Sequence, residues 1–145
     1  MEEVKEVFIS KSFEETISIG ETLAKKLSGG NIIALYGELG AGKTHFVKGI
    51  GKGLGIKKEI TSPTFVISQQ YKGKDINLIH LDLYRIHSFS ELEDLGWYDF
   101  LNPENIIIIE WADKIENELE GYSVIKIFFA YLSENEREIK IIYPS

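Results

Sequence analysis

Residues 37–44, with the sequence Gly-Glu-Leu-Gly-Ala-Gly-Lys-Thr, constrain the fold more than any other segment of the chain. They match the pattern G-x-x-x-x-G-K-[ST] at every fixed position. The apolar residues 31–36 predict a strand before this turn, and residues 43–53 predict a helix after it, whose buried side chains are Phe46, Val47, Ile50 and Leu54. A glycine-rich turn between a strand and a helix is typical of a P-loop, which binds nucleotide phosphates.

Each fixed residue of this turn has a physical reason. Glycines permit backbone angles that direct several N–H groups inward, and the N-terminus of the following helix attracts phosphate. Lys43 would place its charge on the β- and γ-phosphates, and the Thr44 hydroxyl could ligate Mg²⁺. A Rossmann-type dinucleotide site is a poor alternative, because no G-x-G-x-x-G lies in this turn.

Two further predicted strands end in a carboxylate. Glu110 follows the β-branched run 106–109, which is typical of a central strand buried on both faces, and Asp82 follows residues 78–81. Ligands in open α/β sheets lie beyond the carboxyl ends of the strands, so both acids could point at the γ-phosphate. The alternative is that each acid is a solvated or turn-forming residue. His80 shares a strand face with Asp82, which predicts a hydrogen-bonded His80–Asp82 pair.

The remaining pattern predicts one domain over residues 1–145 with an α/β fold, in which helices flank a mixed parallel and antiparallel sheet. Capping boxes Ser12–Glu15 and Ser90–Glu93 predict two helices, the first ending at Gly29-Gly30 and the second covering residues 90–95. The other predicted strands are residues 4–9, 65–71, 76–83, 122–131 and 136–143, with residues 72–75 as a hairpin loop.

Composition and charge indicate which partners and which cellular location to expect. The chain has no cysteine and a net charge of −7, and its arginines are Arg85 and Arg137 alone. A protein that grips RNA or DNA by itself usually needs a basic face, so we expect a partner to hold any nucleic acid. No signal peptide or membrane-length apolar run begins the chain, which predicts a cytoplasmic protein without a membrane partner.

Several motifs together resemble the TsaE (YjeE) family, bacterial ATPases needed to make threonylcarbamoyladenosine in tRNA. Besides residues 37–44, the resemblance rests on Ser62-Pro63-Thr64-Phe65, His80-Leu81-Asp82-Leu83-Tyr84-Arg85, Glu91-Leu92 ahead of Gly96, and Glu110-Trp111. It covers nearly the whole chain. From position alone, the Thr61–Thr64 loop is either a γ-phosphate sensor or a proline-fixed turn.

The resemblance implies ATP and Mg²⁺ as cofactors, with the metal held by Thr44 and Glu110. Asp82 would be the second essential acid and Lys43 the catalytic cation, although Asp82 as the metal ligand stays open. His45 stands where the family typically has a second threonine. The implied nucleotide-binding residues are Thr16, Glu38, Leu39, Gly40, Ala41, Gly42, Lys43, Thr44, His45 and Arg137.

The resemblance also implies protein partners, TsaB and TsaD, with tRNA contacted only indirectly and no DNA partner. Thr64, Arg85 and Trp111 are the candidate partner or sensing residues. Three other functions compete with an ATPase. A small-molecule kinase usually needs several arginines and a lid, a GTPase usually carries an N-K-x-D element that this sequence lacks, and a non-catalytic nucleotide-gated binding module stays open.

Overall fold

The computed structural model describes residues 4–38, 42–61 and 68–144. Within these ranges the strands form one seven-stranded sheet in the order β1-β7-β6-β2-β5-β4-β3. The strands are β1 (Val4–Ser10), β2 (Ile32–Tyr36), β3 (Ser68–Tyr71), β4 (Asn77–Asp82), β5 (Asn105–Glu110), β6 (Val124–Ser133) and β7 (Glu136–Tyr143). The helices are α1 (Phe13–Ala24), α2 (Lys43–Gly53), α3 (Phe89–Leu95), α4 (Trp97–Phe100), the 3₁₀ helix η1 (Ala112–Ile115) and α5 (Glu116–Leu119).

The sheet has a parallel centre and antiparallel margins. Strands β4, β5, β2 and β6 run parallel to one another, whereas β3 pairs antiparallel with β4, β7 with β6, and β1 with β7. All six residues of β5 are buried, because this strand lies between β2 and β4 with helices over both faces. The predicted mixed α/β sheet and the predicted central strand are therefore confirmed.

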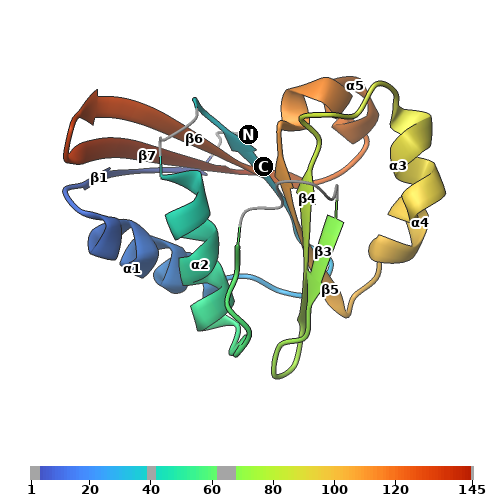
Figure 1. The fold of residues 1–145 in the computed structure, drawn as a ribbon, viewed down its shortest axis with the longest axis horizontal. Coiled ribbons are helices and arrows are strands. Elements are labelled where there is room, and N and C mark those ends of the chain that lie inside the picture. The colour runs from blue at the N-terminus through green and yellow to red at the C-terminus, as the bar shows by residue number, and fades with distance from the viewer. Residues whose placement is uncertain (1–3, 39–41, 62–67, 145) are drawn as a thin grey trace.

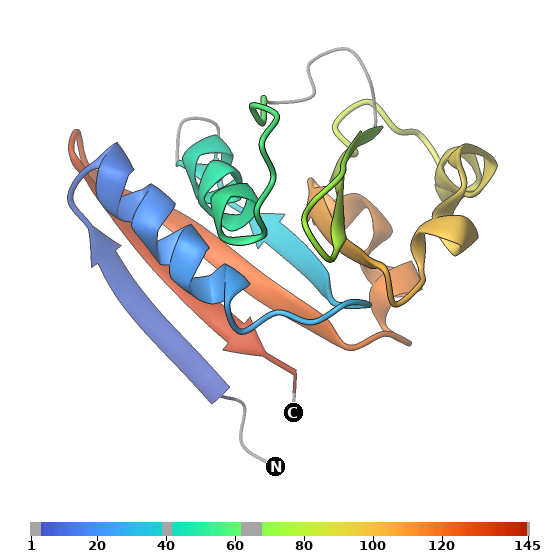
Figure 2. The same ribbon diagram turned by 90° about the horizontal axis from the view of Figure 1, so that it is seen from below.

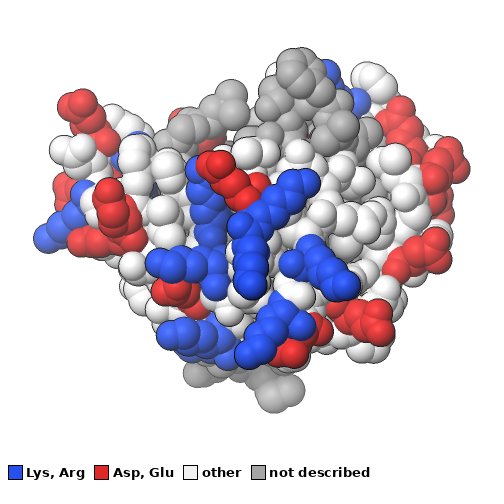
Figure 3. All heavy atoms as spheres, turned by 60° about the horizontal axis from the view of Figure 1, so that its bottom comes forward, with Lys and Arg blue, Asp and Glu red and all other residues white. Residues whose placement is uncertain are grey.

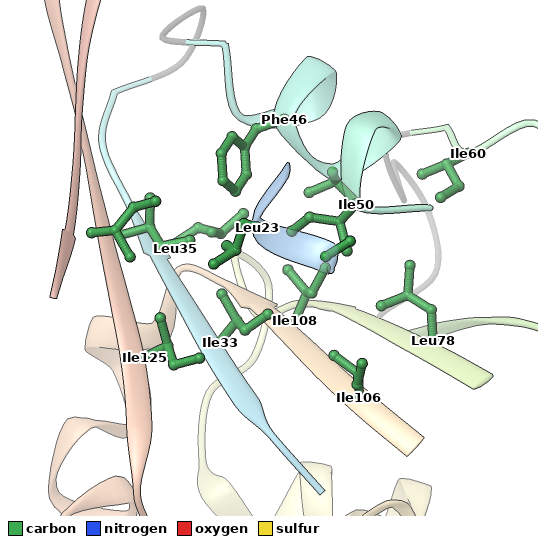
Figure 4. Close-up of a cluster of buried hydrophobic side chains, with 14 of the residues drawn as sticks. Leu23, Ile33, Leu35, Phe46, Ile50, Ile60, Leu78, Ile106, Ile108 and Ile125 are labelled. Atoms are coloured by element: carbon green, nitrogen blue, oxygen red, sulfur yellow. The ribbon is translucent and has the colours of Figure 1, made fainter. Parts of the chain in front are cut away.

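Helices cover the two faces unequally (Figures 1 and 2). Helices α1 and α2 pack on one face, over β1, β7, β6, β2 and β5, and α3, α4, η1 and α5 lie on the opposite side, over β2, β5 and β4. Figure 4 shows Phe46 and Ile50 of α2 pointing toward Ile33 and Ile108 of the central strands. These side chains are fully buried, as the sequence pattern of α2 predicts.

Two glycines bring α1 and α2 into backbone contact. A Cβ atom on Gly20 would lie 2.3 Å from the Phe46 carbonyl oxygen, and one on Gly49 would lie 2.0 Å from the Ile17 carbonyl oxygen. Since neither position leaves room for a side chain, α2 is held firmly against α1. This packing fixes the helix that begins at the end of the glycine-rich turn.

Helix boundaries differ from the sequence prediction in two places. Helix α1 ends at Ala24 rather than at Gly29-Gly30, because its final turn tightens into i→i−3 hydrogen bonds from Lys25 and the next two residues. Helix α3 begins one residue earlier than predicted, and Ser88 rather than Ser90 occupies its N-cap position. The predicted Ser12 cap is confirmed, since its hydroxyl accepts a hydrogen bond from the Glu15 amide.

Short elements escaped prediction. Helices α4, η1 and α5 are each four residues long, too short for a periodic pattern to appear. The predicted strand 65–71 is described only from Ser68 onward, since residues 65–67 lie outside the described ranges. Among the described helices, none is long and apolar enough to cross a membrane.

Candidate nucleotide-binding site

The glycine-rich turn connects the end of β2 to the start of α2, as predicted. Gly37 has φ = +147°, and a Cβ there would lie 2.8 Å from the Phe129 carbonyl oxygen, so both conformation and space require glycine. Gly42 has φ = +94° and is the N-cap of α2. The predicted site residues Leu39, Gly40 and Ala41 lie outside the described residues.

The side chain of Lys43 turns back toward this loop. Its Nζ atom donates a hydrogen bond to the Gly37 carbonyl oxygen at 2.8 Å and lies 5.2 Å from the centroid of the Trp111 ring. A cation over an indole face is attracted to the ring. Because Lys43 is 7% exposed, its charge lies within the protein surface at the loop. Trp111 therefore belongs to the surroundings of the P-loop lysine.

The start of α2 suits an anion. Gly42 has no side chain to cap the helix, so the first-turn amides have no side-chain partner from that position. Free amides and the positive end of the helix dipole favour phosphate there. Thr44 is the second residue of α2 and is partly buried, and Glu38, on the other side of the turn, is exposed.

The two predicted acids are neighbours at the same edge of the sheet. Asp82 and Glu110 are register partners on the parallel strands β4 and β5, and Glu110 is also paired with Leu35 of β2. Because β2 leads into the glycine-rich turn two residues later, both carboxylates lie at the edge where that turn begins. The structure thus brings Asp82 and Glu110 together beside the turn.

The expected His80–Asp82 pair is wrong. His80 Nε2 instead lies 2.6 Å from Glu110 Oε2, and the two residues are 0% and 5% exposed. Side chains two residues apart on a strand stand almost 7 Å apart, whereas a long glutamate on the neighbouring strand can reach across diagonally. Asp82 Oδ1 accepts a hydrogen bond from the Tyr84 amide at 3.0 Å and so begins the turn after β4.

The environment of Asp82 favours its protonated form more than water does. Burial is the main cause that raises the pKa of this carboxyl, and the negative charge of Glu110 raises it further. The Tyr84 amide, His80 and Lys43 act in the opposite direction. The ionised form of a half-buried carboxylate beside a second acid is destabilised, and a bound cation would stabilise it.

Thr16 and Arg137 flank the turn from the other side. A Cβ atom on Gly42 would lie 3.7 Å from Thr16 Cγ2 and 4.0 Å from Arg137 Cγ. Thr16 is buried, with its hydroxyl 2.6 Å from that of Ser10. Arg137 Nη1 donates to the carbonyl oxygens of Ser133 and Glu136, at 2.8 and 3.0 Å.

A hollow of about 210 Å³ opens next to this pair. It is lined by the β1–α1 connection, by the start of α1 with Phe13, and by the β6–β7 turn, together with Thr16 and Arg137. The ring of Phe13 stacks on His45 at a centroid distance of 4.0 Å, and burial lowers the pKa of His45. The sequence pattern gave no reason to single out Phe13, because its position at the wall depends on the folding of β1 beside β7.

The predicted sensing residues lie at the opposite side of the turn. Trp111 adopts a left-handed conformation with φ = 60° and ψ = 40°, and its ring lies 4.9 Å from that of Tyr84. Such a conformation costs a non-glycine residue roughly 1–2 kcal/mol. Lys114 Nζ donates to the carbonyls of Tyr84 and Ile86, which holds the segment that carries the exposed Arg85. Thr64 lies outside the described residues.

A parallel sheet whose inner strand leads through a glycine-rich turn into a helix, with acids ending the next two strands, defines a P-loop NTPase-like α/β protein. The model of one family, described as threonylcarbamoyl adenosine biosynthesis protein TsaE, matches residues 10–139. The chain belongs to the TsaE family.

Relatives support this assignment. The chain is 38% identical to a tRNA threonylcarbamoyladenosine biosynthesis protein TsaE from Treponema pallidum, covering 92% of this chain and 97% of the relative. It is 37% identical to the TsaE protein of Aquifex aeolicus, covering 97% and 98% of the two chains. The crystal structure of Bacillus subtilis YdiB superposes with a TM-score of 0.79 at 29% identity, over 100% of this chain and 89% of that chain.

Proposed function

We propose that residues 1–145 form one nucleotide-binding domain that hydrolyses ATP with Mg²⁺, in the cytoplasm, during the threonylcarbamoyladenosine modification of tRNA. The observation that carries this proposal is the pairing of Asp82 with Glu110 beside the strand that leads into the P-loop. Two acids and one buried lysine, Lys43, then surround the end of α2 where phosphate would bind. The relatives named TsaE supply the pathway.

The chemistry of these donors fits Mg²⁺. The ion prefers oxygen ligands, takes few of them from the protein and keeps the rest from water and phosphate. Glu110 retains Oε1 after its contact with His80, Asp82 retains Oδ2 after its contact with Tyr84, and Thr44 offers a hydroxyl. When bound, Mg²⁺ would neutralise charge on the phosphates during transfer. We assign Thr44 and Glu110 to hold it.

The two acids have different constraints, which supports different roles. His80 fixes the direction of Glu110, as an oriented metal ligand requires. Asp82 is half-buried and its pKa is raised, so it is the better group to accept a proton from, or to orient, an attacking water. The swap, in which Asp82 holds the metal, makes the opposite prediction for single substitutions.

The nucleotide would extend from the P-loop toward the hollow beside Thr16 and Arg137. The glycine-rich turn, Lys43 and the first turn of α2 would hold the phosphates. The 210 Å³ hollow with Phe13 at its wall offers an apolar ring for stacking with the base or sugar. This arrangement gives Thr16, His45 and Arg137 positions at the outer part of the nucleotide.

Protein partners complete the proposal. We assign the exposed ring of Tyr84, the strained Trp111 and Arg85 to a docking and sensing surface for TsaB and TsaD. Trp111 contacts Lys43 and Tyr84, so it would couple that surface to the phosphates. A conformation that costs energy is a means of switching between two states when ligands bind.

One observation favours a second candidate, a nucleotide-gated binding module that does not hydrolyse ATP. Arg137 donates hydrogen bonds to backbone carbonyls of the β6–β7 turn, so in this conformation its guanidinium stabilises that turn. An arginine at the transition state can accelerate phosphoryl transfer by about 10³–10⁵-fold. A partner must then supply, or reposition, the missing charge if hydrolysis is to be fast.

Reconstituted tRNA modification tests the proposal. Unmodified tRNA, ATP, the threonylcarbamoyl donor, TsaB and TsaD are mixed with this chain, and both phosphate release and threonylcarbamoyladenosine are measured. We expect multiple turnovers only with the wild-type chain, and none with Asp82→Asn. Modification by Asp82→Asn at the wild-type rate, without phosphate release, would instead support the binding module.

A further inference from the structure

A group of lysines lies on the C-terminal half of α2 and on the segments beside that end of the helix. Two are on α2 itself, two follow it directly, and two lie in the β3–β4 hairpin loop; they are Lys48, Lys52, Lys57, Lys58, Lys72 and Lys74, here called the lysine face. The hairpin is tied to α2 by the Lys74 amide, which donates to the Leu54 carbonyl at 3.4 Å. Figure 3 shows blue side chains gathered on this side of the molecule.

The lysine face has a local excess of positive charge although the whole chain carries −7. Its segments contain two acids, Glu59 and Asp75. Glu59 lies 3.9 Å from Lys48, and Glu21 of α1 lies 3.8 Å from Lys52, but the Lys52 side chain is 70% exposed and the Glu59 side chain is 80% exposed. Exposed pairs of this kind interact weakly and leave the lysines available to other anions.

Two of the lysines border a hollow of about 280 Å³. Lys52 and Lys74 line this hollow together with residues 53–55, Asp75 and Ile76. The hollow therefore brings two lysines of the lysine face to one concave site, together with one acid, Asp75.

The choice of lysine indicates the class of ligand. Protein–protein interfaces are depleted of lysine and favour arginine and aromatic residues, whereas lysine acts as a flexible point charge on phosphates. Helix dipole compensation explains only Lys52, the one basic residue in the last turn of α2. The four lysines outside the helix need another reason.

We propose that the lysine face contacts the phosphate backbone of RNA, with one phosphate seated between Lys52 and Lys74. At 1.5 Å per residue, the eleven residues of α2 separate this face from the P-loop by roughly 16 Å, so RNA and ATP would bind at opposite ends of one helix. This goes beyond the proposed ATPase function. It differs from the expectation that a partner holds any nucleic acid, because the local charge of a surface decides where phosphate binds.

Charge reversal tests the proposal with a matched control. Lys52→Glu/Lys74→Glu removes the two lysines of the hollow, and Lys5→Glu/Lys126→Glu makes the same change in net charge on the exposed face of the sheet, where both residues flank Ile142. Binding of a fluorescent, unmodified tRNA transcript is measured by anisotropy between 50 and 200 mM KCl. Thermal unfolding of each variant checks that it is folded.

We expect the Lys52/Lys74 variant to bind the transcript about tenfold more weakly at low salt, with a log–log salt slope smaller by about 2, and the control to stay near wild type. Equal loss in both variants, or no loss in either, would overturn the proposal. Labelled polyglutamate is the second probe: if it binds as tightly as tRNA and responds equally to the substitutions, the surface serves an acidic protein and the RNA assignment fails. ATP binding by the Lys52/Lys74 variant is measured in parallel, so that a failure here is distinguished from a failure of the ATPase proposal.

Discussion

His80 Nε2 lies 2.6 Å from Glu110 Oε2, so a buried imidazole on β4 holds the carboxylate that ends β5. The same glutamate is the register partner of Asp82, and it is the last residue of β5, the strand beside β2. One hydrogen bond thus connects the interior of the sheet to the edge where we propose that Mg²⁺ binds. This relationship gives His80 a positioning role.

We expect His80→Ala to lower the affinity of the ATP-bound protein for Mg²⁺. We also expect it to destabilise the fold by about 1–3 kcal/mol, because Glu110 would lose its buried partner. His80→Gln, whose amide can still donate, should recover most of the Mg²⁺ response. The measurements are urea unfolding and ATPase rate against Mg²⁺ concentration. A loss of stability in both variants with an unchanged Mg²⁺ midpoint would restrict His80 to a structural role.

Single substitutions of the two acids separate their roles. Glu110→Gln should weaken the dependence of ATP affinity on Mg²⁺, because a metal ligand is lost. Asp82→Asn should keep that dependence while turnover falls by about 10²-fold or more, as expected for the loss of a base or a water-orienting group. Calorimetry with and without Mg²⁺, together with single-turnover hydrolysis, checks both. Reversed results would assign the metal to Asp82.

Gly37 cannot be replaced without cost. Gly37→Ala would place a methyl group 2.8 Å from the Phe129 carbonyl oxygen at φ = +147°, so we expect a loss of stability of about 1–3 kcal/mol and a larger loss of ATP affinity. Gly30→Ala is the matched control, since that glycine also has positive φ but a Cβ there meets no atom within 4 Å. Denaturation and nucleotide titration of both variants show whether the close contact with β6 causes the loss of stability and of ATP affinity. Equal losses in Gly37→Ala and Gly30→Ala would contradict this role.

Partners should accelerate hydrolysis through the Tyr84–Trp111 surface. We expect a slow basal ATPase rate that rises on titration with TsaB and TsaD, and we expect Arg85→Ala to shift the titration midpoint or reduce the plateau. Trp111→Gly relieves the left-handed conformation but removes the ring from Lys43 and Tyr84, so it should reduce stimulation without unfolding the chain. A fast basal rate that the partners leave unchanged argues against this surface.

Local patterns were sufficient for part of the site. The P-loop and the helix that follows it are contiguous in sequence, and the carboxyl-end rule correctly placed Asp82 and Glu110 beside it. The partner of His80 was missed because it depends on β4 lying next to β5 and on their register. The hollow beside Thr16 and Arg137 requires β1 to pair with β7, residues more than a hundred positions apart.

Net charge does not describe the local charge of one surface. A net charge of −7 averages over the whole chain, whereas the lysine face gathers residues from α2, the segment after it and the β3–β4 hairpin. The contact between that hairpin and Leu54 helps to bring them together. Long-range contacts of this kind leave no periodic signal in the sequence.

The central claim is that Lys43, Thr44 and the glycine-rich turn bind the phosphates of Mg²⁺-ATP. Calorimetric titration of ATP, with and without Mg²⁺, into the wild type, Lys43→Ala and Thr44→Ala tests it most directly. We predict that Lys43→Ala abolishes measurable binding, because the charge directed at the β- and γ-phosphates is gone, and that Thr44→Ala keeps binding but loses the Mg²⁺ dependence and most of the hydrolysis. Wild-type affinity for Mg²⁺-ATP in Lys43→Ala would contradict the site assignment.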